Sequence, residues 1–194
     1  SLSFAVIALL AAPLADAGTP IDKSSPADPA GQVEISNIAG AVTVTGWDRN
    51  EVEVTGELGD GVERLEFTSA DKLTRIKVVM PNRSWHVEDT TLIVKVPAGS
   101  SINVNTVSAD VEAHAIKGQQ RLQTVSANIT TDSGAEDVEV KTVSGDVRVN
   151  GDMQKGMLTL TTVSGDATVT RVSGEVNVST VSGDFSLVLG EMTR

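Results

Sequence analysis

A five-residue motif recurs through the second half of the chain and constrains its fold more than any other feature. The motif is Thr-Val-Ser, then Gly or Ala, then Asp or Asn. Its copies begin at Thr106, Thr124, Thr142, Thr162 and Thr180, so successive copies lie 18, 18, 20 and 18 residues apart. A fixed period of this length is typical of proteins in which one small structural unit stacks on the next.

The composition indicates that each unit is built from strands. Hydrophobic residues make up 40% of the chain but aromatic residues only 3%, and Val and Thr dominate the repeats. β-branched side chains suit a pleated sheet and disfavour helices. We therefore predict an all-β fold: a single-stranded β-solenoid with coils of about 18 residues over 101–194, preceded over 32–100 by an irregular N-terminal β region or the first coils.

The alternation of side chains along a strand assigns rows of residues to the two faces of each coil. The apolar residues before and after each motif are out of phase, which predicts a corner at the residue pair that ends in the motif Thr. The predicted inward rows are Val104, Leu122, Val140, Leu160 and Val178; Val107, Val125, Val143, Val163 and Val181; Ala109, Ala127, Gly145, Gly165 and Gly183; and Val111, Ile129, Val147, Ala167 and Phe185. The predicted outward rows are the Thr and Ser of each motif, with Asp110, Asn128, Asp146, Asp166 and Asp184.

The row of acidic residues raises the question of a metal ion. Like charges on neighbouring strands, about 4.8 Å apart, repel each other, and calcium-binding nonapeptide rolls compensate such charges with Ca²⁺. The two glycines that open that nonapeptide motif are missing here. Asn128 keeps the hydrogen-bonding capacity of the row and loses the charge, which favours capping of backbone N–H groups in the Ser-Gly-Asp turn. We therefore predict a structural role for this row, and no metal or other cofactor.

Few other residues are candidates for binding or catalysis. Trp47 and Trp85 form the predicted binding surface, since Trp is enriched at binding hot spots, although packing over a sheet end is the alternative. His86 and His114 are far apart and lack metal-ligand spacing. The absence of Cys excludes disulfides and thiolate sites. We predict no catalytic residues.

The first residues have the pattern of a targeting segment. An apolar run from Leu2 to Leu10 precedes Ala15-Asp16-Ala17, which predicts a secretory signal peptide over 1–17, truncated at its start. The run is shorter than the roughly 20 residues of a membrane helix, so we expect no membrane span in the mature chain. Residues 18–31 are rich in Pro, Ser, Asp and Ala and are predicted to be a flexible linker. The expected location is the periplasm or the cell surface.

Three segments carry a resemblance to a known family. They are the opening Asn37-Ile38-Ala39-Gly40-Ala41-Val42-Thr43-Val44, the turn Gly46-Trp47-Asp48 and the link Val96-Pro97-Ala98-Gly99. Together with the repeats, they make residues 32–194 resemble the bacterial putative-adhesin family of unknown function, a β-solenoid domain with Ser-Gly-Asp-Val repeats. The resemblance implies an exported envelope protein and supplies no catalytic residues.

The functional prediction combines these observations. The net charge of −11 argues against nucleic acid as a partner. We expect an exported, non-enzymatic binding or scaffold protein of the cell envelope, adhesin-like, whose partner is an unknown protein or glycan. The alternatives are a polysaccharide-active β-helix enzyme that uses the Asp row, and an ice-binding or calcium-binding repeat array. The last coil lacks a polar cap, which predicts end-to-end self-association. The binding site is expected around Trp47, Trp85 and the loop from Gly151 to Gly156.

Overall fold

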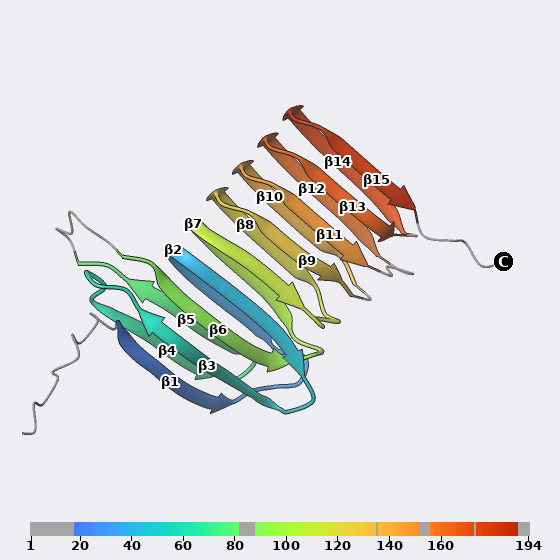
Figure 1. Ribbon diagram of the computed structural model, residues 1–194. Helices are drawn as coiled ribbons and strands as arrows, with labels where there is room; N and C mark the ends of the chain where they lie inside the picture. Colours follow the sequence, from blue (N-terminus) through green and yellow to red (C-terminus); the bar gives the residue numbers. More distant parts are fainter. Residues whose placement is uncertain (1–17, 82–87, 135, 152–155, 173, 190–194) are drawn as a thin grey trace, which may run out of the picture.

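A computed structural model describes residues 18–81, 88–134, 136–151, 156–172 and 174–189. These ranges contain strands and no helix, which confirms the all-β prediction, and the strands form one large, open, mixed sheet (Figure 1). The strands are β1 Thr19–Pro26, β2 Gln32–Trp47, β3 Glu51–Leu58, β4 Arg64–Ala70, β5 Leu73–Val79, β6 Thr90–Pro97, β7 Ser101–His114, β8 Gln120–Ser126, β9 Ile129–Ser133, β10 Val138–Ser144, β11 Val147–Gly151, β12 Met157–Ser164, β13 Ala167–Val172, β14 Glu175–Ser182 and β15 Phe185–Leu189. Within the same ranges, a search for a helix with the length and hydrophobicity of a membrane span finds none.

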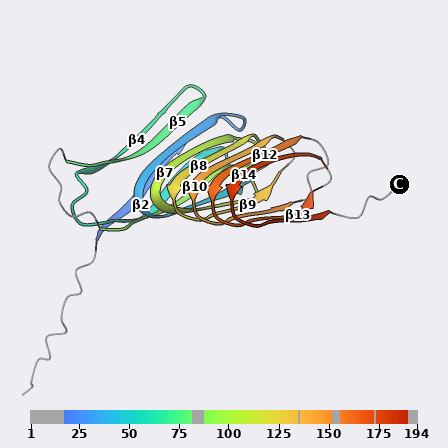
Figure 2. The same ribbon diagram turned by 90° about the horizontal axis from the view of Figure 1, so that it is seen from above.

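The sheet folds over on itself at a row of bends. Strands β2 and β7 run through the bend, whereas in each later repeat the bend separates two strands, as it separates β8 from β9. The first face contains β4, β5, the first half of β2, the first half of β7, β8, β10, β12 and β14. The second face contains β1, β3, β6, the remaining halves of β2 and β7, β9, β11, β13 and β15. Figure 2 looks along the stack and shows the two faces opposite each other, joined at the bends.

Parallel pairing stacks equivalent residues of successive repeats on one another. Val104 lies opposite Leu122, which lies opposite Val140, and the row continues through Leu160 to Val178. All but Val178 are fully buried, and Val178 packs against the edge of the core. Burial of each aliphatic side chain stabilises the fold by roughly 1.5–3 kcal/mol. A single repeat cannot cover its own apolar residues, so the stack as a whole forms the core.

The structure corrects the prediction for the two residues at the start of each motif. In the first four copies the motif Thr residues, predicted to face outward, are buried: Thr106, Thr124, Thr142 and Thr162 are 7%, 5%, 4% and 1% exposed. Thr180 of the fifth copy is exposed. The Val residues that follow, predicted to face inward, are exposed: Val107, Val125, Val143 and Val163 are 46%, 45%, 48% and 43% exposed. The change of phase therefore lies two residues further along the chain, at the pair formed by Val and Ser. The Thr stays in phase with the buried row before it, and both Val and Ser point outward.

Beyond the bend, the predicted inward rows are largely buried. Ala109 and Ala127 are buried, as are Val111, Ile129, Val147 and Ala167. Phe185, the equivalent residue in the last described repeat, is 40% exposed. The later bends depend on glycine: Gly165 has a φ of 135°, and a Cβ there would lie 2.3 Å from the carbonyl oxygen of Gly145. Only glycine allows this backbone conformation and this close approach.

The structure of the N-terminal part corrects one prediction and decides between two alternatives of another. Residues 18–31 are not a flexible linker throughout, because β1 pairs antiparallel with β3 and Ile21 is buried. Strand β2 belongs to the repeat arrangement, since Asn37 lies opposite Thr106 and Gly40 lies opposite Ala109. The stack therefore begins at β2, inside the region predicted to hold an irregular β region or the first coils. The strands between β2 and β7 extend the two faces: β5 and β4 continue the first, and β6, β3 and β1 the second.

Candidate functional site

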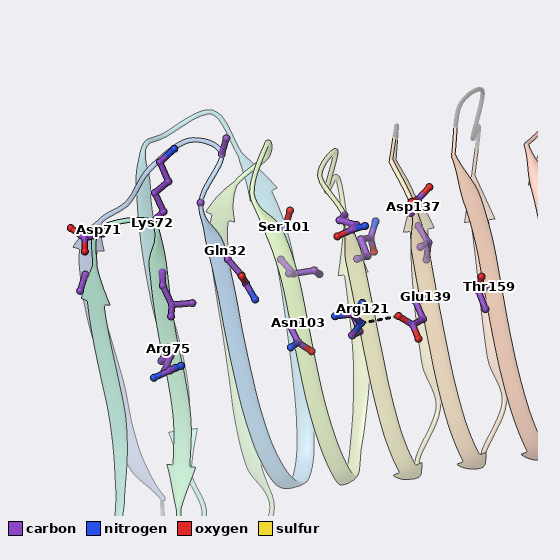
Figure 3. A pocket seen from close by; sticks show the side chains of 18 of the residues that line it. Gln32, Asp71, Lys72, Arg75, Ser101, Asn103, Arg121, Asp137, Glu139 and Thr159 are labelled. Carbon is purple, nitrogen blue, oxygen red and sulfur yellow. Dashed lines mark hydrogen bonds and ion pairs between the residues drawn. The ribbon is translucent and has the colours of Figure 1, made fainter.

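An open cleft of about 960 Å³ lies on the first face, where the strands of successive repeats begin. The tip of the β4–β5 hairpin forms one end of the cleft, and β12 lies at the other end (Figure 3). Its polar lining residues include Gln32, Asp71, Lys72, Arg75, Ser101, Asn103, Arg121, Asp137, Glu139 and Thr159. The cleft thus draws side chains from across the stack rather than from one repeat.

Backbone contacts hold the hairpin tip against the stack. Ala70 pairs with Leu73, which leaves Asp71 and Lys72 as a two-residue turn. Asp71 has a φ of 52°, a conformation that Asp adopts more readily than most residues and that such hairpin turns require. The backbone N–H of Gln32 donates to the carbonyl oxygen of Lys72 at 2.7 Å. Gly31 adjoins this bond, since a Cβ there would lie 2.9 Å from the same oxygen.

A polar row crosses the floor of the cleft. The members of this row lie opposite one another on successive strands of the first face. They are Arg75, Glu34, Asn103, Arg121, Glu139 and Thr159. Side chains in such a row are separated by the interstrand distance of about 4.8 Å and point to the same side of the sheet. The floor therefore presents regularly spaced hydrogen-bonding groups on a rigid support.

Ion pairs fix the charged members of the polar row. Arg75 Nε lies 2.8 Å from Glu34 Oε2, and Arg121 Nε lies 2.7 Å from Glu139 Oε2. Lys141 also pairs with Glu139. Hydrogen bonds from Lys141 and then from Arg121 lower the pKa of Glu139, because both favour its ionised form. Nearby, Asp137 Oδ1 accepts a hydrogen bond from the backbone N–H of Met157 at 2.8 Å.

The cleft was not predicted from the sequence. Its floor residues occupy outward positions on separate strands, where polar side chains are ordinary surface residues. The polar row could have been recognised in the sequence because polar residues recur at the same position before each motif, with the spacing of the repeats. The approach of Asp71 and Lys72 could not be inferred, because it depends on where an inserted hairpin folds.

Trp47, one of the two predicted binding residues, is half-buried at the end of β2. Its Nε1 donates to the carbonyl oxygen of Glu51 at 2.7 Å. The cationic groups of Arg49 and Lys95 lie 5.0 Å and 5.4 Å from the ring centroid, within the range of cation–π interactions. A binding role for Trp47 stays a prediction. Trp85, His86 and residues 152–155 of the predicted loop site lie outside the described residues.

The acidic row at the bend forms hydrogen bonds between repeats. Asp110 Oδ1 accepts from the backbone N–H of Asn128 at 2.8 Å, and Asn128 Oδ1 accepts from that of Asp146 at 3.0 Å. Asp146 and Asp166 continue the pattern toward Asp184, at 3.1 Å and 3.0 Å. The side chains therefore accept from backbone N–H groups, as predicted for a cap, but the donor is in the next repeat and not in the same turn. No group of three His, Asp or Glu residues suited to a metal ion is found in the described parts of the chain.

Comparison with known proteins places the chain in a family. The model of the Toastrack DUF4097 family matches residues 32–193. The chain belongs to this family. The Toastrack chain also resembles a structure from Clostridium sporogenes described as a "putative cell adhesion protein", with a TM-score of 0.59 and 11% sequence identity over 88% of this chain and 100% of that one. At this identity the likeness concerns the fold alone.

A second structure gives a weaker match to the Toastrack chain. It is a "putative adhesin" from Bacteroides fragilis, with a TM-score of 0.47 and 12% identity over 88% of this chain and 94% of that one. A comparison with curated proteins finds no match to the Toastrack chain.

Proposed function

We propose that this Toastrack chain is an exported, non-enzymatic binding module of the cell envelope, adhesin-like in role. In this proposal the chain is a β-solenoid with coils of about 18 residues, because paired residues of most neighbouring repeats are 18 positions apart in the sequence. The solenoid serves as a scaffold for the cleft on the first face. The observation that carries the proposal is the cleft itself. Its volume of about 960 Å³ lies in the range of ligand pockets, roughly 300–1,000 Å³.

The scaffold supports a binding role because it holds the cleft side chains in place. The strands that carry the polar row are paired on both sides and anchored by a continuous buried core. Sites built on strands are held more precisely than sites built on loops. Ion pairs further restrict Arg75, Arg121 and Glu139. A ligand would therefore meet groups that lose little side-chain entropy on binding.

The contacts of two cleft carboxylates, Glu139 and Asp137, support a non-enzymatic role. A glycosidase needs one carboxyl group with a raised pKa, which acts as general acid beside a second carboxylate. The pKa of Glu139 is instead lowered by Lys141 and Arg121, and Asp137 accepts a backbone hydrogen bond. These contacts weigh against the polysaccharide-active alternative. The ice-binding alternative loses its Thr row, because the motif Thr residues of the first four copies are buried.

Export and the envelope location rest on the sequence pattern of residues 1–17, which lie outside the described residues. The name of the Clostridium sporogenes structure agrees with an adhesin-like role. Fractionation of cells that express the full chain tests this part: we expect the protein in the periplasmic or surface fraction, shortened at Ala17. Retention of the uncleaved chain in the cytoplasm would contradict it.

Binding through the cleft is tested with two variants of one repeat. Thr159 and Thr168 are both half-buried and point outward, but Thr159 lines the cleft and Thr168 lies on the second face. Purified exported protein is incubated with a cell-envelope preparation of the producing organism, and the bound fraction is measured. We expect Thr159→Trp to abolish binding by filling the cleft and Thr168→Trp to bind like the unmodified protein. Equal binding by both variants would refute the cleft as the site.

A further inference from the structure

We infer that the cleft binds an uncharged, hydroxyl-rich ligand, namely a segment of a neutral glycan. The inference rests on the proposed function, since it names the ligand class of the same cleft. Three features of the cleft support it: the balance of its charges, the type and spacing of its neutral side chains, and the pairing of its strands.

The charges in the cleft lining cancel, although the chain as a whole is strongly acidic. The residues that line the cleft include three cationic side chains, Lys72, Arg75 and Arg121, and three acidic ones, Asp71, Asp137 and Glu139. Glu34 of the polar row and Lys141, which pairs with Glu139, add one charge of each sign. The chain carries a net charge of −11. An anionic ligand would find no surplus of cations here and would be repelled by the field of the whole protein. A cationic ligand would have to displace Arg121 and Lys141 from Glu139.

The neutral side chains of the cleft suit hydroxyl groups. Those that are not fully buried are Gln32, Thr68, Ser101, Asn103, Gln119 and Thr159. Amide and hydroxyl side chains can both donate and accept hydrogen bonds, as a sugar hydroxyl does. Gln32 and Ser101 lie opposite each other on neighbouring strands, and Asn103 and Thr159 are the neutral members of the polar row. The interstrand spacing of about 4.8 Å is close to the length of one pyranose ring. Successive sugar rings laid across the strands would therefore meet equivalent positions.

The pairing of the strands argues against an extended peptide as the ligand. A peptide that binds a sheet usually adds a strand at a free edge. The strands of the cleft floor, β5, β2, β7, β8, β10 and β12, are each paired on both sides, so the floor offers no edge. Strand β4, which contributes Thr68 and Ala70 at one end of the cleft, pairs with β5 alone among the described strands. Of the larger apolar residues of the lining, Ile102 and Val138 are buried, Leu73 is half-buried and Met157 is 40% exposed, so the apolar surface open to peptide side chains is confined to the two ends of the cleft. Recognition on the floor of the cleft must therefore come mainly from polar side chains.

Titration of the purified exported chain with defined probes tests the inference. The neutral probes are maltotetraose, cellotetraose and chitotetraose, and the comparison probes are tetragalacturonate and an octapeptide of Gly and Ser. We expect at least one neutral probe to bind, with tetragalacturonate and the peptide much weaker. Loss of one hydrogen bond in Thr159→Val should weaken binding about 3- to 10-fold, whereas Thr168→Val on the second face should leave it unchanged. Asn103→Leu, which removes a whole amide, should weaken it about tenfold or more.

The outcomes separate this inference from the proposed function. If tetragalacturonate or the peptide binds the cleft as tightly as any neutral probe, or if no neutral probe binds, the neutral-glycan inference is overturned. The proposed function would survive either result, provided that envelope binding is still lost in Thr159→Trp and kept in Thr168→Trp. If envelope binding does not depend on Thr159, both fail. Unfolding midpoints of the Val variants close to that of the unmodified chain show that a change in affinity is not a folding defect.

Discussion

The inner and outer sides of the bend show an inversion of the usual order of hydrophobicity. The inner side is lined by Thr106, Thr124, Thr142 and Thr162, and the outer side carries Val107, Val125, Val143 and Val163. Valine is the more hydrophobic residue, yet it lies outside. The position of each residue relative to the neighbouring strands decides its side. The Thr follows the buried row before it by two residues, and the Gly or Ala precedes the buried row after it by two residues, so the two residues between them both face outward.

The bend itself therefore requires particular backbone conformations, and the largest expected effect is a change there. Gly165→Val would place a side chain 2.3 Å from a backbone oxygen of the preceding repeat, at a φ of 135°. We expect a loss of about 3 kcal/mol or more in the free energy of unfolding, measured by denaturant titration. Ala127→Gly at the equivalent position is the control and should cost no more than about 1 kcal/mol. A Gly165→Val chain as stable as the unmodified one would show that the bend tolerates other conformations.

A charge introduced on either side of the bend tests the inversion directly. Thr142→Lys would bury an unpaired ammonium group and should cost about 3 kcal/mol or more in unfolding free energy, or prevent folding. Val143→Lys, one residue further along, should stay within about 0.5 kcal/mol of the unmodified chain. Thermal unfolding of the two variants provides the comparison. If Thr142→Lys were more stable than Val143→Lys, Val would lie on the inner side of the bend and Thr on the outer side, as hydrophobicity alone predicts.

The hydroxyl groups on the inner side are not equivalent, and isosteric substitutions should separate them. Thr106 Oγ1 donates to the carbonyl oxygen of Ala109 at 2.9 Å, whereas Thr142 Oγ1 is buried without a partner among the described residues. Thr106→Val should therefore cost about 1 kcal/mol in unfolding free energy. Thr142→Val should be neutral or stabilising, because it removes an unsatisfied polar group. Equal losses in both variants would mean that Thr142 has a partner in solution.

The smallest effect is expected at the acidic row on the outer side of the bend. Asp146 Oδ1 accepts from the backbone N–H of Asp166 at 3.1 Å, in a position that solvent reaches. Asp146→Ala should lower the unfolding free energy by less than about 1 kcal/mol, since water can replace the side chain. Asp146→Asn, which imitates Asn128, should retain the bond and the stability. Chemical unfolding of both variants measures the difference, and a larger loss in the Asn variant would indicate that the charge, rather than the hydrogen bond, stabilises this row.

Much of the fold could be predicted from the repeat. The register of Val104, Leu122, Val140 and Leu160 follows directly from the spacing of the motif, and their burial follows from alternation. The predicted position of the bend was wrong by two residues, because the apolar character of the motif Val suggested an inward position. Strand β1 was missed because its Pro, Ser and Asp residues are typical of loops, and only pairing with β3 makes it a strand.

The sequence by itself determined the period of this protein, and with it which residues stack on which, because the number of residues between equivalent positions sets the pairing. Two things were decided only by the tertiary structure. The first is the side of the bend on which Thr and Val lie, since the buried rows on both flanking strands outweigh the hydrophobicity of one side chain. The second is the cleft, which exists because the hairpin tip at Asp71 and Lys72 is hydrogen-bonded to the start of β2. Contacts between residues so distant along the chain leave no periodic pattern in the sequence.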